Sequence, residues 1–269
     1  MPPSSSETPR PMSTPPDPPP VDLILVPQGA EYQAVERGLR PIPPPQRPRL
    51  VALAVGYEAV IQRLGDPALQ TVLESCRHGL VMGLAGSLSP QLGVGEVVVY
   101  QEIRVLRSAA SVSRLAVTLA AHEPDLDAPD YAPFGCDHGY SASLLQRLPQ
   151  ARSVIALSSD RLVHQGHEKL SLGQQSGAAV VDMEAIALHQ LLHHRGDRPP
   201  LTLGTVRVIS DDCATTLPNL SPAFKADGSL DGWVLAGTLV QNPIAAFNLI
   251  RGSLRALATL EKVTTQLLT

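Results

Sequence analysis

Aromatic side chains and positive charge are both scarce in this sequence. Phe, Trp and Tyr make up 3% of the 269 residues, and the formal net charge at pH 7 is -4. Proteins that bind single-stranded nucleic acids without sequence preference stack the bases on aromatic side chains. A basic stripe is the electrostatic footprint of phosphate binding. The sequence offers neither feature, and we expect no nucleic-acid partner.

Cysteine pairs and long apolar runs are absent as well. Cys76, Cys136 and Cys213 are odd in number and widely spaced, which indicates free thiols in a reducing cytosol. The N-terminus has no apolar signal core, and no apolar run approaches the length of a membrane span. We therefore expect a cytoplasmic protein without stable membrane insertion.

Motifs for several kinds of catalysis are missing. The sequence contains no Gly-x-Ser-x-Gly turn of the α/β-hydrolase type, no Walker A loop and no dinucleotide fingerprint. His189 and His193 are four residues apart, and His164 and His167 are three apart. Neither pair has a third ligand or the His-Glu-x-x-His arrangement of zinc proteases. We expect no metal ion and no bound cofactor.

Alternating strand-like and helix-like segments make up most of the chain. The Pro- and Ser-rich residues 1–20 predict a disordered or polyproline-like tail, followed by one domain over residues 21–269. Apolar runs predict strands at residues 21–26, 50–55, 79–82, 94–100 and 153–157. Helices are predicted at residues 30–39, up to 64, at 68–77 and from about 230 onward, with a break at Pro243, whereas residues 121–137 read as a loop. This order predicts an α/β fold, a three-layer sandwich whose mixed, mostly parallel central sheet is flanked by helices.

Two stretches each begin as an apolar strand and then change to charged residues. In the first, residues 177–188, the strand ends at Asp182-Met183-Glu184 and a helix follows. In the second, residues 201–212, Arg207 and Asp211 lie at or near the end of the strand. Ligand-binding groups of α/β proteins lie where buried strands end. If the two strands are neighbours, their carboxylates and the guanidinium meet in one cleft.

A loop of small residues, 83–96, is the third informative stretch. Its glycines allow the backbone to approach a ligand closely, although an ordinary tight connection would explain them equally well. In order, residues 83–88, 94–99, 181–184 and 207–211 resemble the characteristic segments of the purine nucleoside phosphorylase and methylthioadenosine/S-adenosylhomocysteine nucleosidase superfamily. The C-terminal part is also similar to the hopanoid-associated phosphorylase-like branch, at residues 217–218, 225–231 and 240–243.

The resemblance implies the fold of that superfamily and an enzyme that cleaves the N-glycosidic bond of a purine nucleoside. The expected substrate is a 5′-substituted adenosine, and the expected assembly is a homo-oligomer. Either water or phosphate accepts the sugar, so phosphate is a possible co-substrate. The alternative is a nucleoside-binding regulatory protein of the same fold with little or no turnover.

Each charged residue of the motifs then has an expected role and a simpler alternative. Asp211 is the candidate acid that protonates the leaving base, but a helix N-cap would also place Asp there. Glu184 would accept hydrogen bonds from the ribose hydroxyls, and Asp182 is a further candidate for substrate binding. Glu31 occupies the position of the family's carboxylate that orients the attacking water, or it is a solvated glutamate of a first helical turn. Arg207 would hold phosphate or organise the nucleophile, or it pairs with Asp182 or Glu31.

The remaining expected contacts are apolar or come from the small-residue loop. Met183 would pack against the sugar, or simply in the core. Leu162 would cover the purine, where relatives often have an aromatic side chain. Gly86 and Ser87 would lie against the substrate, with Ser87 replacing a usual glycine. Leu84 stands where many members have a hydroxyl that helps to hold phosphate or water, and this departure motivates the regulatory alternative.

Overall fold

The computed structural model of the protein describes residues 19–54, 56–106, 131–193, 201–220, 223, 237–238 and 240–269. The strands are β1 (Leu23–Pro27), β2 (Arg49–Leu53), β3 (His78–Ser87), β4 (Val97–Leu106), β5 (Tyr131–Gly135), β6 (Arg152–Ser158), β7 (Val180–Asp182) and β8 (Thr202–Asp211). The helices are α1 (Ala30–Leu39), α2 (Tyr57–Leu64), α3 (Pro67–Glu74), α5 (His138–Arg147), α6 (Gly166–Ser176), α7 (Ala185–His193) and α9 (Pro243–Leu268), with a short 3-10 helix at Pro44–Gln46. Residues 1–18 of the predicted tail lie outside the described residues.

The eight strands form one mixed sheet, and five of them close into a ring. β3 pairs with β8 in parallel, β8 with β4 antiparallel, β4 with β6 and β6 with β7 in parallel, and β7 returns antiparallel to β3. β1 and β2 extend the sheet from β3, and β5 adds an antiparallel edge to β4. Most pairings are parallel, so the expected mixed α/β sheet is confirmed.

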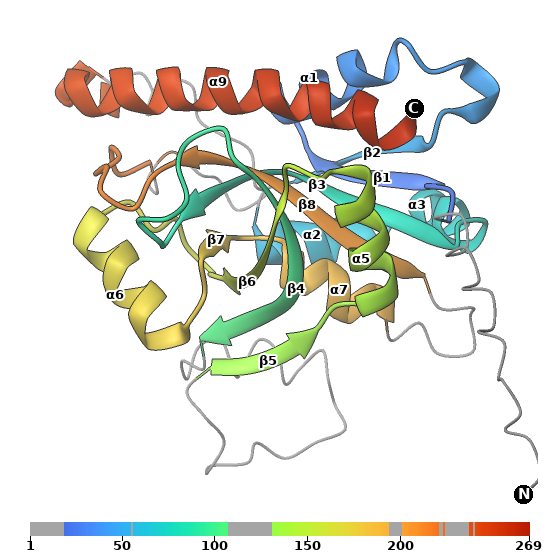
Figure 1. Ribbon diagram of the computed structural model, residues 1–269, viewed down its shortest axis with the longest axis horizontal. Coiled ribbons are helices and arrows are strands. Elements are labelled where there is room, and N and C mark those ends of the chain that lie inside the picture. Colours follow the sequence, from blue (N-terminus) through green and yellow to red (C-terminus); the bar gives the residue numbers. More distant parts are fainter. Residues whose placement is uncertain are drawn as a thin grey trace, which may run out of the picture.

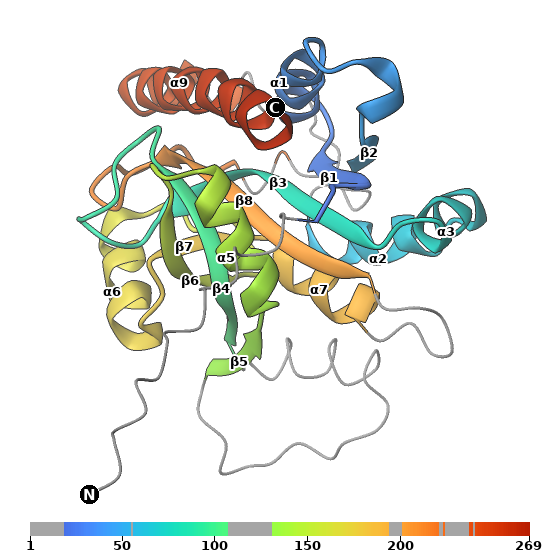
Figure 2. The same ribbon diagram turned by 45° about the vertical axis from the view of Figure 1, so that its right-hand side comes forward.

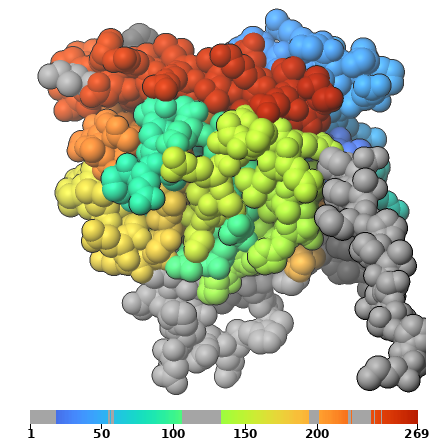
Figure 3. Space-filling model, viewed as in Figure 1, coloured from blue at the N-terminus to red at the C-terminus, as the bar shows by residue number. Residues whose placement is uncertain are grey.

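The strand β1 shows how helices cover both faces of the sheet. Ile24 and Val26 pack with side chains of α1 and α9, whereas Leu23 and Leu25 pack with those of α2, α3 and α7. Side chains alternate between the faces of a strand, so this apolar run serves two cores. Figures 1 and 2 show α1 and α9 on one side of the sheet and α2, α3 and α7 on the other. In the space-filling view α9 forms a continuous ridge along one edge of the molecule (Figure 3).

The segment of residues 83–87, expected to be a loop, is the second half of β3. Gly83 pairs with Arg207 and Leu84 with Val208 in the parallel ladder to β8. Gly83 has a φ of 152°, and a Cβ there would lie 2.4 Å from Nη1 of Arg207. The small residues therefore let two strands and a guanidinium approach one another. From composition alone, the same residues predict a loop.

The loop prediction for residues 121–137 is wrong for residues 131–135, which form a strand. Tyr131–Gly135 forms β5, with Phe134 opposite Ile103 of β4. Pro133 donates no backbone hydrogen bond, which an edge strand tolerates, and among the described strands β5 pairs with β4 alone. Helices α5 and α6 were not expected. The C-terminal helix α9 begins at Pro243, the predicted break, and residues 230–236 lie outside the described residues.

Strands β7 and β8, which carry the charged motifs, are not hydrogen-bonded to each other. Each pairs with β3, which lies between them. Their carboxyl-terminal ends still meet at one place, because the ring brings all three strands together. Within the part of the chain that the structure describes, no helix is both long and apolar enough to cross a membrane. Cys76, Cys136 and Cys213 are buried thiols.

Candidate active site

A pocket of about 240 Å³ opens where β3, β7 and β8 end. Its charged wall comes from α1, from the β7–α7 turn and from the last residue of β8. Its apolar wall comes mainly from β3 and from the segment between β6 and α6. The lining residues are Pro27, Glu31, Leu84, Ala85, Gly86, Arg161, Leu162, Val163, Val181, Asp182, Met183, Glu184, Ser210, Asp211 and Leu217.

Glu31 lies in the first turn of α1, directly after the sharp turn at Gly29, whose φ is 96°. The backbone N–H of Leu84 donates a hydrogen bond of 2.8 Å to Oε1 of Glu31. Burial raises the pKa of Glu31 to about 7; Arg207 opposes the rise and Glu184 adds to it. Near neutral pH this carboxylate therefore exists in both protonation states, as a general base requires.

Arg207 is in the middle of β8 and is fully buried. Its Nη2 lies 3.2 Å from Oδ2 of Asp182 and 3.3 Å from Oε2 of Glu184. Burial alone would lower the pKa of Arg207, but these two carboxylates raise it above its ordinary value, so the guanidinium is charged. Arg207 does not line the pocket. It stands behind the carboxylates as their counter-ion.

Asp182 is held from several sides. The Tyr100 hydroxyl donates to its Oδ2 at 3.1 Å, and the Ser158 hydroxyl donates to its Oδ1 at 2.7 Å. The backbone N–H of Ala185 also donates to Oδ1, at 3.3 Å, at the start of α7. With Arg207 on Oδ2 as well, both carboxylate oxygens are occupied by protein groups. Asp182 therefore fixes the guanidinium and the start of the helix, and it also lines the pocket.

Glu184 faces the pocket from the turn between β7 and α7. Its Oε1 accepts a hydrogen bond of 3.3 Å from the backbone N–H of Gly56, and its Oε2 contacts Arg207. Burial raises the pKa of Glu184; Arg207 opposes the rise and Asp182 adds to it. The carboxylate is thus fixed in direction, with lone pairs left for a ligand in the pocket.

Asp211 is the last residue of β8 and follows a β-bulge. The ladder passes from Ala85–Ile209 to Gly86–Asp211, so Ser210 is the extra residue. Bulges of this kind turn a side chain in a new direction. The Ser210 hydroxyl donates to Oδ1 of Asp211 at 2.6 Å, and the Lys169 ammonium contacts Oδ2. A Cβ on Gly86 would lie 3.0 Å from Oδ2, so glycine leaves room for the carboxylate.

The structure brings most of the sequence-predicted site residues to one pocket. Those that line it are Glu31, Gly86, Leu162, Asp182, Met183, Glu184 and Asp211. Arg207 lies behind the wall. Ser87 is fully buried outside the lining, and its hydroxyl donates to the carbonyl of Ser89. Leu84 lines the pocket.

Sequence reasoning missed three polar residues that support this site. Tyr100 and Ser158 hold Asp182, and Lys169 pairs with Asp211. Tyr100 lay in the predicted strand at residues 94–100 and Ser158 directly after the predicted strand at residues 153–157, and nothing marked either as a polar partner of a distant carboxylate. Lys169 lies on α6, which was not predicted. Among the described residues, no group of three or more His, Cys, Asp and Glu side chains is placed to hold a metal ion.

The chain belongs to the phosphorylase superfamily, whose family model matches residues 45–228. Solved structures share the fold over 91% of this chain. They include futalosine hydrolase of Helicobacter pylori (TM-score 0.59, 13% identity, 95% of that chain covered) and the methylthioadenosine/S-adenosylhomocysteine nucleosidase of Neisseria meningitidis (0.59, 15%, 96%). The S-adenosylhomocysteine nucleosidase of Streptococcus pyogenes has a TM-score of 0.58 at 16% identity, with 94% of that chain covered. No match was found among curated proteins.

Proposed function

We propose that the protein hydrolyses the N-glycosidic bond of a purine nucleoside, a 5′-substituted adenosine, and releases the free base. Membership of the phosphorylase superfamily and the fold shared with nucleosidases support a reaction on nucleosides. One observation carries the proposal. The carboxylates of Glu31, Glu184 and Asp211 line a single pocket at the ends of the strands.

Cleavage of the bond leaves positive charge on the sugar and negative charge on the base. The carboxylates of Glu31 and Glu184 stabilise the oxocarbenium-like sugar as it develops. Asp211, on the β8 side of the pocket, donates a proton to N7 of the base. The electron pair of the C1′–N9 bond then passes to a neutral leaving group. Glu184 accepts hydrogen bonds from the ribose hydroxyls, which orients C1′ toward the nucleophile.

Water is the nucleophile that this pocket favours. Besides the proton donor Asp211, three acidic side chains line it: Glu31, Asp182 and Glu184. Among the lining residues the one guanidinium is Arg161, which pairs with Glu168 outside the lining. Among the described residues that line the pocket, no cation lacks a carboxylate partner, so a phosphate dianion would meet the carboxylates of Glu31, Asp182 and Glu184, and like charges repel strongly where water is scarce. Glu31, with a pKa of about 7, takes the proton of the attacking water.

A second candidate function rests on Leu84. Its aliphatic side chain lines the pocket where a hydroxyl would help to hold the nucleophile. A nucleoside-binding regulatory protein with little turnover would tolerate this loss. The two candidates differ in one measurable property, which is product formation.

The test is incubation of the purified protein with methylthioadenosine and, separately, with inosine, followed by chromatography of the bases. The proposal expects adenine from methylthioadenosine and slower release of hypoxanthine from inosine. Binding of methylthioadenosine in a calorimeter without release of adenine would support the regulatory alternative. If the protein neither binds any adenosine derivative nor releases a base from it, both functions are contradicted.

The proposal also includes a cytoplasmic location and a homo-oligomer. The three buried thiols are compatible with a reducing compartment. Phe247 and Leu254 on α9 are 62% and 63% exposed, an apolar surface of the kind that subunit contacts cover. Sedimentation velocity over a range of concentrations tests the assembly, and a monomer throughout would contradict it.

A further inference from the structure

Lys169 is fully buried in the core of the protein. An ammonium group without water costs much free energy unless it is paired and hydrogen-bonded. Its Nζ contacts Oδ2 of Asp211 and donates to the carbonyls of Asp212 at 3.2 Å and Thr215 at 3.3 Å. An ammonium has three N–H donors, and each has an acceptor here. Lys169 is therefore a charged group in a preformed cage.

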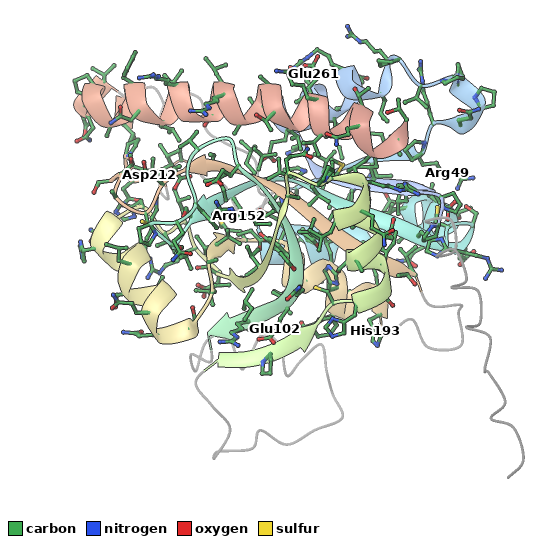
Figure 4. All side chains as sticks on the ribbon, viewed as in Figure 1. Arg49, Glu102, Arg152, His193, Asp212 and Glu261 are labelled. Carbon is green, nitrogen blue, oxygen red and sulfur yellow. The ribbon has the colours of Figure 1, made fainter. Side chains whose placement is uncertain are left out.

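The fold brings α6 against the segment that follows β8. A Cβ on Gly166, one turn before Lys169, would lie 2.9 Å from the carbonyl oxygen of Ala214. The Asp212 carboxylate accepts from the backbone N–H groups of Ala214, at 3.1 Å, and Thr215, at 2.7 Å. This turn directs the Asp212 and Thr215 carbonyls to the ammonium. Asp212 is labelled beside α6 in Figure 4.

The contact between Lys169 and Asp211 connects the buried ammonium to the pocket. Asp211 lines the pocket, whereas Lys169 does not, so the contact of the ammonium with the pocket runs through that carboxyl group. The second oxygen of Asp211 is held by the Ser210 hydroxyl. The carboxyl group that faces the leaving base is thus fixed at both oxygens, and one of its two partners carries a full positive charge.

We propose that Lys169 is a positioning residue and the counter-ion of the general acid Asp211, an inference that rests on the proposed function. When the Asp211 carboxyl gives its proton to N7, the C1′–N9 bond breaks and its electron pair goes to the base. Asp211 is left as a carboxylate, and the adjacent ammonium stabilises that charge in surroundings with little water. After the base leaves, Asp211 regains its proton from solvent.

The test compares two leaving groups, because only one of them needs an acid. Adenine in methylthioadenosine requires protonation, whereas the phenolate of 4-nitrophenyl riboside departs without it. In Lys169→Met we expect kcat for methylthioadenosine to fall about 100-fold, with little change in KM, because general acid catalysis contributes about that much or more. Turnover of 4-nitrophenyl riboside should fall less than about threefold, since its leaving group needs no acid. Equal losses for both substrates, or no loss for either, would overturn the inference.

A double variant keeps the test decisive if Lys169→Met folds poorly. Removing both members of a buried pair leaves no unpaired charge, so Asp211→Asn with Lys169→Met is compared with Asp211→Asn alone. If Lys169 acts through Asp211, both should turn over methylthioadenosine at the same residual rate. A further tenfold drop in the double variant would show an independent role and overturn the inference. The wild-type controls test the proposed function separately. If the wild type releases no adenine, whether or not it releases nitrophenolate, the proposed function itself fails.

Discussion

The buried guanidinium of Arg207 contacts the buried carboxylate of Glu184, with 3.3 Å between Nη2 and Oε2. The same nitrogen contacts Asp182, so one cation serves two acids behind the pocket wall. Removing one member of a buried pair leaves an uncompensated charge, which typically costs about 3–5 kcal/mol. We therefore expect Arg207→Met to lower the free energy of unfolding by about that amount, measured by chemical denaturation.

The matched control for that prediction is Arg152→Met. Arg152, labelled in Figure 4, pairs with Glu96 at 3.2 Å near the surface, where the Arg152 side chain is exposed and the Glu96 side chain is partly exposed. An exposed pair contributes at most about 1 kcal/mol. If Arg207→Met unfolds no more easily than Arg152→Met, the guanidinium is not the electrostatic centre of the site.

Substitution of Glu184 should affect turnover through the sugar. Glu184→Gln keeps the shape of the side chain and removes the charge that stabilises the sugar cation. We expect kcat/KM for methylthioadenosine to fall by roughly 100-fold, since a comparable loss follows removal of one stabilising group in other enzymes. Glu102→Gln on β4, away from the pocket lining, serves as control and should retain activity. Full activity in Glu184→Gln would exclude the proposed role.

The pH dependence of the reaction should report Glu31. Its pKa is raised to about 7, and the ionised carboxylate is the form that accepts a proton from water. We expect kcat/KM to rise with pH along a limb centred near 7. In Glu31→Gln that limb should be lost together with most of the rate. An unchanged limb in this variant would assign the titration to another group.

Gly83 should be intolerant of any side chain. A Cβ there would meet Nη1 of Arg207 at 2.4 Å, and the φ of 152° is one that other residues rarely adopt. Backbone strain and overpacking of a core each cost about 1–3 kcal/mol. Gly83→Ala combines both defects and should therefore lower the free energy of unfolding by several kcal/mol. Gly135→Ala is the control, because no atom lies within 4 Å of a Cβ at that position. Equal melting temperatures for the two variants would contradict this geometry.

Much of the fold could be predicted because its signals are local. The helix at residues 30–39 matches α1, and the apolar run at residues 153–157 lies within β6. The change from strand to helix around Asp182 was visible because an apolar run stops at a carboxylate and helical spacing begins. These elements are marked by short-range periodicity, which a single sequence displays directly.

The rest depends on contacts between distant segments. The small residues 83–87 read as a loop, and only the ladder to β8 makes them a strand. Helix α6 carries few apolar side chains at helical spacing, so Lys169 gave no signal of its own. Arg207 was visible as a charged residue in a strand, but its position behind the pocket follows from the closed ring of strands. Register and closure are properties of the whole sheet.

The most direct measurement is the identity of the sugar product in phosphate buffer, followed by proton and phosphorus NMR with methylthioadenosine as substrate. We predict free adenine and free methylthioribose, at a rate that does not depend on the phosphate concentration, and release of adenine by Asp211→Asn at only a small residual fraction of the wild-type rate. A sugar 1-phosphate that accumulates in proportion to phosphate would contradict water as the nucleophile. Undiminished release of adenine by Asp211→Asn would contradict the role of the pocket itself.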